Sequence, residues 1–201
     1  SMLRLLGADL PATRTPWEQV LRTLLARGLS TRPGVSWSRP SRSYIANQGR
    51  AAAHRLPWEP GITAARRAPR LAVVVDVSGS IDAALLDRFA REVQAIVRRL
   101  QASLVLVVGD DRVRQVLQHD PARGRGSRID LCDVAFGGGG GTDFTPLLQE
   151  ADRHRPDIGV VLTDLEGPAR FRPGWPVIWA VPDWGAQGGA TAPFGRLLAL
   201  R

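Results

Sequence analysis

The stretch Leu71-Ala72-Val73-Val74-Val75-Asp76, continued by Val77-Ser78-Gly79-Ser80, decides the fold class of this 201-residue chain. The run at 71–75 is apolar throughout and ends in three valines, which is typical of a central parallel strand buried on both faces. A carboxylate and small hydroxyl-bearing residues follow it directly. We therefore expect 71–75 to form the first core strand of a sheet, with Asp76 at its carboxyl end.

Strand and helix patterns alternate along the rest of the chain. Helices are predicted at 16–27, 83–100 and 146–154, strands at 104–108, 112–118, 158–163 and 177–181, and a short apolar segment at 197–200. This alternation predicts an α/β fold, a doubly wound, mostly parallel sheet flanked by helices as in Rossmann-like proteins. Ligands of such sheets bind beyond the carboxyl ends of the strands, where the strand order reverses.

The chain is expected to divide into an N-terminal region, 1–69, and the α/β domain, 70–201. The N-terminal helix at 16–27 begins at a predicted capping box, in which Thr15 and Glu18 each satisfy a backbone amide. One apolar face of this helix is expected to be buried.

An extended arm is predicted at 30–69, because this stretch is rich in Ser, Arg and Pro and shows no sustained periodicity. It contains Trp37, Tyr44 and Trp58, which are costly to leave exposed. We therefore expect the arm to pack against the domain that follows it.

The formal net charge of +8 is concentrated in the first third of the chain. Residues 1–70 hold 12 arginines and 3 acidic residues, whereas 71–201 hold 15 arginines and 16 acidic residues. Arginines interleaved with tryptophans can contact phosphates and stack on bases, so nucleic-acid binding through the arm stays open as an alternative function. The absence of lysine also fits a GC-rich coding sequence, which would explain the arginines without any function.

No apolar run approaches the roughly 20 residues that a membrane-spanning helix needs, and the first residues lack the layout of a signal peptide. Cys132 is the single cysteine, so it cannot form an intramolecular disulfide. We therefore expect a cytoplasmic protein with no membrane partner.

Three polar clusters fall where this fold would bring them together. Asp76, Ser78 and Ser80 follow the first core strand, Thr142 follows a run of glycines at 137–141, and Asp164 follows the strand at 158–163. Carboxylate and hydroxyl oxygens, without His or thiolate, are ligands for a hard cation.

These five residues are therefore predicted to bind Mg²⁺, or Mn²⁺ or Ca²⁺ in its place. Gly79 allows the sharp turn between the two serines, and Gly141 and Asp143 are expected to support the ligands around Thr142. With only two carboxylates in reach, the ion would keep an open position for an acidic side chain of a partner protein.

The order Asp76-x-Ser78-x-Ser80, Thr142, Asp164 resembles the metal-ion-dependent adhesion site (MIDAS) of von Willebrand factor A (VWA) domains, over roughly residues 70–201. By that resemblance the two serines and Thr142 would ligate the ion directly or nearly so. Asp76 and Asp164 would act directly or through water.

The flanking stretches 36–42, 140–144 and 193–195 resemble bacterial VWA-like proteins that carry a metallopeptidase-like region ahead of the VWA domain. Members of that wider group often work with MoxR-type AAA+ ATPases. The chain contains no His-Glu-x-x-His zinc motif, which removes the basis for calling it a protease. The resemblance therefore implies a non-enzymatic, metal-dependent protein-interaction module, an adaptor or substrate-recognition component of such an ATPase. A metal-dependent hydrolase is a weaker alternative, because no general base can be named.

Overall fold

A computed structural model describes residues 15–29, 34–48, 57–63, 68–77, 81–121, 141–183 and 191–200. The elements in these residues are α1 (Trp17–Gly28), β1 (Gly34–Pro40), α2 (Arg42–Gln48), β2 (Pro60–Thr63), β3 (Arg70–Asp76), α3 (Ala83–Leu100), β4 (Ser103–Gly109), β5 (Val113–His119), α4 (Phe144–Arg153), β6 (Ile158–Leu162), β7 (Val177–Pro182) and β8 (Arg196–Leu200). The strand and helix patterns predicted for the α/β domain are all present, and the terminal apolar segment forms β8.

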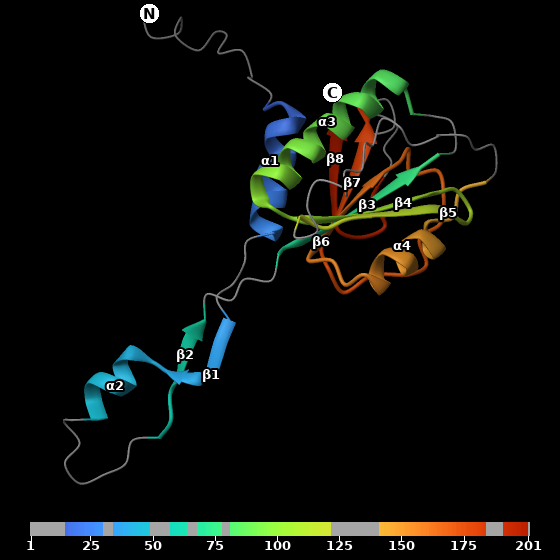
Figure 1. Ribbon diagram of the computed structural model, residues 1–201. Coiled ribbons are helices and arrows are strands. Elements are labelled where there is room, and N and C mark those ends of the chain that lie inside the picture. The colour runs from blue at the N-terminus through green and yellow to red at the C-terminus, as the bar shows by residue number, and fades with distance from the viewer. Residues whose placement is uncertain are drawn as a thin grey trace, which may run out of the picture.

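Six strands form one sheet in the order β5-β4-β3-β6-β7-β8 (Figure 1). All neighbours in this sheet are parallel except β4 and β5, which form an antiparallel edge. The chain runs from β3 outward to β4 and β5, and then returns to place β6 on the other side of β3. The predicted mostly parallel, doubly wound sheet is confirmed, and the strand order reverses beside β3.

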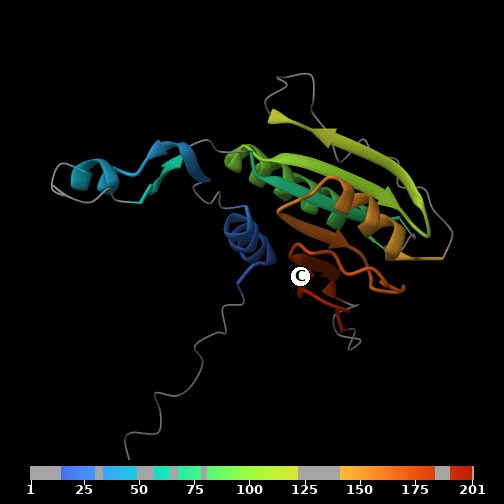
Figure 2. The same cartoon turned by 90° about the horizontal axis from the view of Figure 1, so that it is seen from below.

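Helices cover both faces of the sheet: α1 and α3 lie on one face and α4 on the other (Figures 1 and 2). Side chains of β3 alternate between the two apolar cores, with Val73 and Val75 facing α1 and α3, and Ala72 and Val74 facing α4. Because each face of β3 is covered, the strand can be apolar throughout, as its sequence indicates. Because β3 is held on both faces, the position of Asp76, its last residue, is set by the strand.

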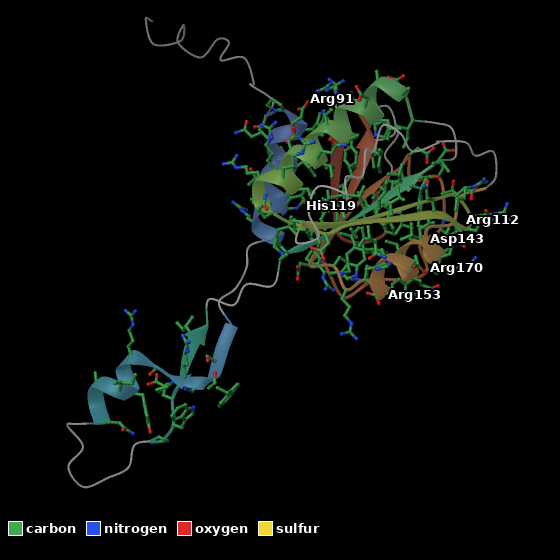
Figure 3. All side chains as sticks on the ribbon, in the orientation of Figure 1. Arg91, Arg112, His119, Asp143, Arg153 and Arg170 are labelled. Carbon is green, nitrogen blue, oxygen red and sulfur yellow. The ribbon has the colours of Figure 1, made fainter. Side chains whose placement is uncertain are left out.

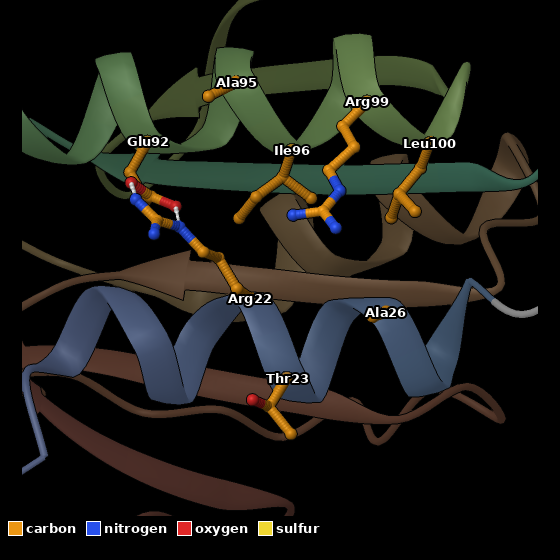
Figure 4. Close-up of a pocket in the computed structure, with 8 residues that line it drawn as sticks. All are labelled: Arg22, Thr23, Ala26, Glu92, Ala95, Ile96, Arg99 and Leu100. Atoms are coloured by element: carbon orange, nitrogen blue, oxygen red, sulfur yellow. Dashed lines mark hydrogen bonds and ion pairs between the residues drawn. The ribbon is translucent and has the colours of Figure 1, made fainter.

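Helix α1 belongs to the domain, because Trp17, Leu21 and Leu25 are buried in the same core as α3 and β8. Arg22 reaches across to α3, where its Nη2 donates to Glu92 Oε2 at 2.6 Å and its Nε donates to the other carboxylate oxygen (Figure 4). A groove of about 440 Å³ runs between the two helices beside this ion pair. The ion pair and the shared core hold α1 against the α/β domain.

The predicted capping box of α1 is wrong. The helix begins at Trp17, its N-cap is Pro16, and no side chain caps it. Glu18 instead forms an ion pair with Arg88 of α3. The helix begins one residue later than the capping box requires, so Glu18 stands at its second position and not at the third.

The described part of the arm differs from the extended, packed segment that we expected. Strands β1 and β2 pair antiparallel, and α2 lies between them in the chain. The hairpin stands apart from the six-stranded sheet (Figures 1 and 2), and Trp37 and Ile62 are 75% and 82% exposed. Local hydrogen bonds stabilise the turn into α2, since Ser41 Oγ accepts from Tyr44 N and donates to Glu59. Packing of the arm on the domain is therefore not seen in these residues.

No helix in the described ranges is long and apolar enough to cross a membrane.

Candidate metal centre

Asp76 lies at the carboxyl end of β3 with its side chain buried, 3% exposed. Its Oδ2 accepts a hydrogen bond from Thr163 Oγ1 at 3.1 Å. Thr163 is the first residue after β6, and Val75 of β3 pairs with Leu162 of β6. The carboxyl ends of the two neighbouring strands are thus joined at Asp76, on the side where the strand order reverses.

Asp164 occupies the next position and is also buried, 5% exposed. Its Oδ1 accepts from Glu166 N at 2.8 Å, and Thr163 Oγ1 accepts from Leu165 N at 3.0 Å. Leu165 has a φ of 69°, a left-handed conformation that an L-residue adopts only at a cost. Backbone amides of the turn donate to both preceding side chains, and these hydrogen bonds hold the strained turn and orient the Asp164 carboxylate.

Thr142 is brought to the same edge by contacts with the turn after Asp164. A Cβ placed on Gly167 would lie 2.7 Å from Thr142 O and 2.8 Å from Thr142 Cγ2, so the two residues pack backbone to side chain. Phe144 N donates to Pro168 O at 2.9 Å. Thr142 therefore packs on the turn that follows Asp164, at a glycine three positions further along the chain.

Asp143 has a definite structural role as the N-cap of α4, where its Oδ1 accepts from Thr145 N at 2.8 Å. This cap explains why α4 begins at Phe144, two residues earlier than predicted. Gly141 is exposed, and nothing lies within 4 Å of a Cβ built on it. Asp143 therefore supports Thr142 by fixing the start of the helix that follows it.

Ser78, Gly79 and Ser80 lie outside the described residues, so the structure places Asp76, Thr142 and Asp164 of the five predicted ligands. These three residues offer two carboxylates and a hydroxyl, and such oxygen donors fit Mg²⁺ or Mn²⁺. Within the described ranges no group of three or more His, Cys, Asp or Glu residues could hold a metal. The predicted site contains two acidic ligands, so it is not a group of that kind.

Asp110 is a buried acid at this edge that sequence reasoning missed. It follows β4, its residue is fully buried, and its Oδ2 forms an ion pair with Arg114 of β5. The Arg114 guanidinium lowers the pKa of Asp110 from its ordinary value of 3.8 to about 2. The Asp110 carbonyl accepts from Asp143 N at 3.2 Å, which links the end of β4 to the start of α4.

The sequence pattern in this stretch predicts only the strand at 112–118. One usable signal was present, since Asp110 directly follows a strand as apolar as β3. An acid in that position lies at the same edge of the sheet as Asp76 and Asp164.

Two family models match the chain. One, described as "VWA-like domain (DUF2201)", matches residues 71–201, and the other, described as "Putative metallopeptidase domain", matches residues 1–63. Searches of curated proteins and of solved structures found no match. The first model spans more than half of the chain, including the six-stranded sheet and the positions of Asp76, Thr142 and Asp164. On these grounds the chain belongs to the VWA-like domain (DUF2201) family.

Proposed function

We propose that this protein is a non-enzymatic, metal-dependent protein-interaction module. The observation that supports the proposal is the burial of Asp76 and Asp164 at the carboxyl ends of the neighbouring strands β3 and β6. Asp76 accepts a hydrogen bond from Thr163, the neighbour of Asp164, and Thr142 packs on Gly167 in the turn that follows Asp164. Family membership supports an interaction role for the same domain.

Asp76, Thr142 and Asp164, together with Ser78 and Ser80, would hold a divalent cation of the MIDAS type. When bound, the ion supplies an electrophilic position that a carboxylate can occupy. The protein's own contribution is to bury both acids and to fix them with hydrogen bonds from Thr163 and from the turn after Asp164. A hydroxyl ligand such as Thr142 adds no negative charge, which leaves the ion attractive to an acidic side chain.

The rim of this edge is suited to an acidic partner. Arg112 and Arg170 lie at the same end of the sheet as Asp143 (Figure 3), and both side chains are exposed. Both are tied to the site by backbone bonds, Arg112 O accepting from Asp110 N at 3.2 Å and Arg170 N donating to Thr145 Oγ1 at 3.0 Å. Positive groups around the edge favour approach of a carboxylate-bearing protein.

The partner system that we propose is a MoxR-type AAA+ ATPase, for which this protein would act as an adaptor or substrate-recognition component. The support for this finer assignment is the likeness of the flanking stretches to bacterial VWA-like proteins of that group. A binding rather than a catalytic role is proposed because no general base can be named beside the acids.

The test is capture of a purified MoxR-type ATPase from the same organism by the immobilised protein, in Mg²⁺ and in chelator. We expect capture in Mg²⁺ that is lost in chelator and lost in Asp164→Asn. Asp157→Asn is the matched control, since Asp157 precedes β6 at the opposite end and its Oδ2 accepts from Arg70 N at 2.8 Å. Capture that is equal in chelator, or equal for both variants, would contradict a metal-dependent interaction.

Nucleic-acid binding through the arm is the second candidate. Trp37 is 75% exposed, and Arg39, two residues further along β1, is exposed as well. An exposed indole beside a guanidinium can stack on a base and contact a phosphate. A gel shift of single-stranded RNA and DNA that weakens with salt and with Trp37→Ala would favour this candidate, and the absence of any shift would eliminate it.

A further inference from the structure

The end of β4 connects the candidate metal centre to the edge of the sheet through one fully buried acid, Asp110. Its carbonyl accepts from Asp143 N at 3.2 Å, and its own amide donates to Arg112 O at 3.2 Å. Asp143 is the neighbour of Thr142. The backbone of Asp110 is therefore the point at which the β4–β5 turn holds the loop that carries Thr142.

The side chain of Asp110 is paired with the Arg114 guanidinium, and the Asp111 carboxyl and the Arg112 backbone also interact with it. Oδ2 pairs with Arg114, while Oδ1 is buried and accepts no hydrogen bond within the described part of the chain. A buried carboxylate is tolerated only where it is paired. The position of Asp110 therefore depends on Arg114, whose side chain is 37% exposed on the edge strand.

The end of β4 packs closely on α4 and on the β4–β5 turn. A Cβ on Gly109 would lie 2.1 Å from Arg112 O and 2.6 Å from Leu147 Cδ2. A shift of Asp110 toward solvent would loosen this packing and draw the Asp110 carbonyl away from Asp143 N. Thr142 would then keep only its contacts with the turn after Asp164.

We propose that Asp110 and Arg114 form a positioning pair that holds Thr142 in the arrangement that binds the divalent cation. This inference rests on the proposed metal centre and adds two residues to it that do not contact the ion. Removing the charge of Arg114 leaves a buried carboxylate without its partner, so the turn moves outward to hydrate Asp110. The loop at 141–143 loses its tether to β4, and the ion loses a correctly placed hydroxyl.

The experiment is a calorimetric titration of Mn²⁺ into the full chain for wild type, Arg114→Gln, Arg114→Lys and Arg91→Gln. Arg91→Gln is the matched control, because Arg91 pairs with Asp87 at the same spacing of four residues on the exposed surface of α3. We expect about a tenfold weaker Mn²⁺ affinity in Arg114→Gln, partial recovery in Arg114→Lys, and wild-type affinity in Arg91→Gln. Hydrogen exchange supplies a readout without metal, in which the Asp143 amide should exchange faster in Arg114→Gln alone.

The outcomes separate this inference from the proposed function. If wild type binds Mn²⁺ and Arg114→Gln binds it equally well with unchanged Asp143 exchange, the positioning pair is refuted while the metal centre stands. If wild type binds no Mn²⁺, both are refuted. If Arg114→Gln unfolds more easily but binds Mn²⁺ normally below its unfolding transition, the pair has a merely structural role and the inference fails.

Discussion

Replacement of Gly167 by Ala should weaken metal binding through one close contact. The added Cβ would lie 2.7, 2.8 and 2.9 Å from three atoms of Thr142, its O, Cγ2 and Cβ. Carbon contacts are normally about 3.5–4 Å, so Thr142 must move by roughly half an ångström to one ångström. The φ of Gly167 is not positive, so the backbone itself accepts alanine. The effect therefore isolates the position of Thr142.

The size of this effect follows from the cost of overpacking, about 1–3 kcal/mol for a forced methyl group. Thr142 lies in a loop at the edge of the sheet, so the loop can move to accommodate the methyl group when no metal is bound. The cost of overpacking is then expected mainly in the metal-bound state, in which Thr142 must stay in place. Since about 1.4 kcal/mol corresponds to tenfold in affinity, we expect the Kd for Mn²⁺ to rise by tenfold or more.

The assay is calorimetric titration of Mn²⁺, accompanied by urea unfolding without metal. Gly174→Ala is the matched control, because nothing lies within 4 Å of a Cβ at that glycine. Equal Mn²⁺ affinity in Gly167→Ala, Gly174→Ala and wild type would refute the placement of Thr142 in the metal centre.

Three further predictions concern the framework of the domain. Because Arg114 lowers the pKa of Asp110 from 3.8 to about 2, the pair stabilises the fold above pH 4 and loses this contribution as the pH falls toward 2. Urea unfolding of wild type and Asp110→Asn at pH 7 and at pH 2 measures this contribution. The difference in unfolding free energy between the two proteins should shrink by up to about 2 kcal/mol at the lower pH. Leu21→Ala should lower the free energy of unfolding by about 2–5 kcal/mol, because Leu21 of α1 is fully buried in the core that α1 shares with α3. A urea unfolding curve that matches wild type would contradict the packing of α1 on the domain. Trp179→Phe removes the donor to Phe194 O, a bond of 2.6 Å, and should cost about 1–3 kcal/mol by thermal or urea unfolding; no loss would show that water replaces it.

The α/β domain could be predicted from sequence because local pattern and tertiary burial agree there. Val73 to Val75 are β-branched and continuous, and both faces of β3 are covered, which is the environment that such a run requires. The same agreement held for α3, whose apolar stripe faces the sheet. Where the local hydrophobic pattern agrees with the burial that the whole fold imposes, secondary structure can be predicted from a single sequence.

The arm and the start of α1 could not be predicted, because distant contacts decide them. Glu18 forms an ion pair with Arg88, seventy positions away. Strand β1 pairs with β2 across the chain that includes α2, a non-local contact that no periodicity in 34–40 reveals. Helix and strand propensities describe local sequence only, so they cannot predict which distant residue a side chain or strand will pair with.

The candidate site was predicted in part for a physical reason. Asp76 and Asp164 follow strongly apolar strands, so their place at the carboxyl edge follows from the strand pattern alone. Asp110 follows an equally apolar strand, but it precedes a second acid, Asp111, and so resembled an exposed turn. Its burial depends on Arg114, and a pairing of that kind is fixed by the β4–β5 register and not by composition.

The central claim is that Asp76, Thr142 and Asp164 hold a divalent cation at the switch point of the sheet. The most direct test is calorimetric titration of Mn²⁺ into metal-stripped wild type, Asp164→Asn and the matched control Asp157→Asn. We predict saturable binding of one ion per chain in wild type and in Asp157→Asn, and its loss in Asp164→Asn with the fold retained. Absence of binding in wild type, or equal binding in all three proteins, would contradict the claim.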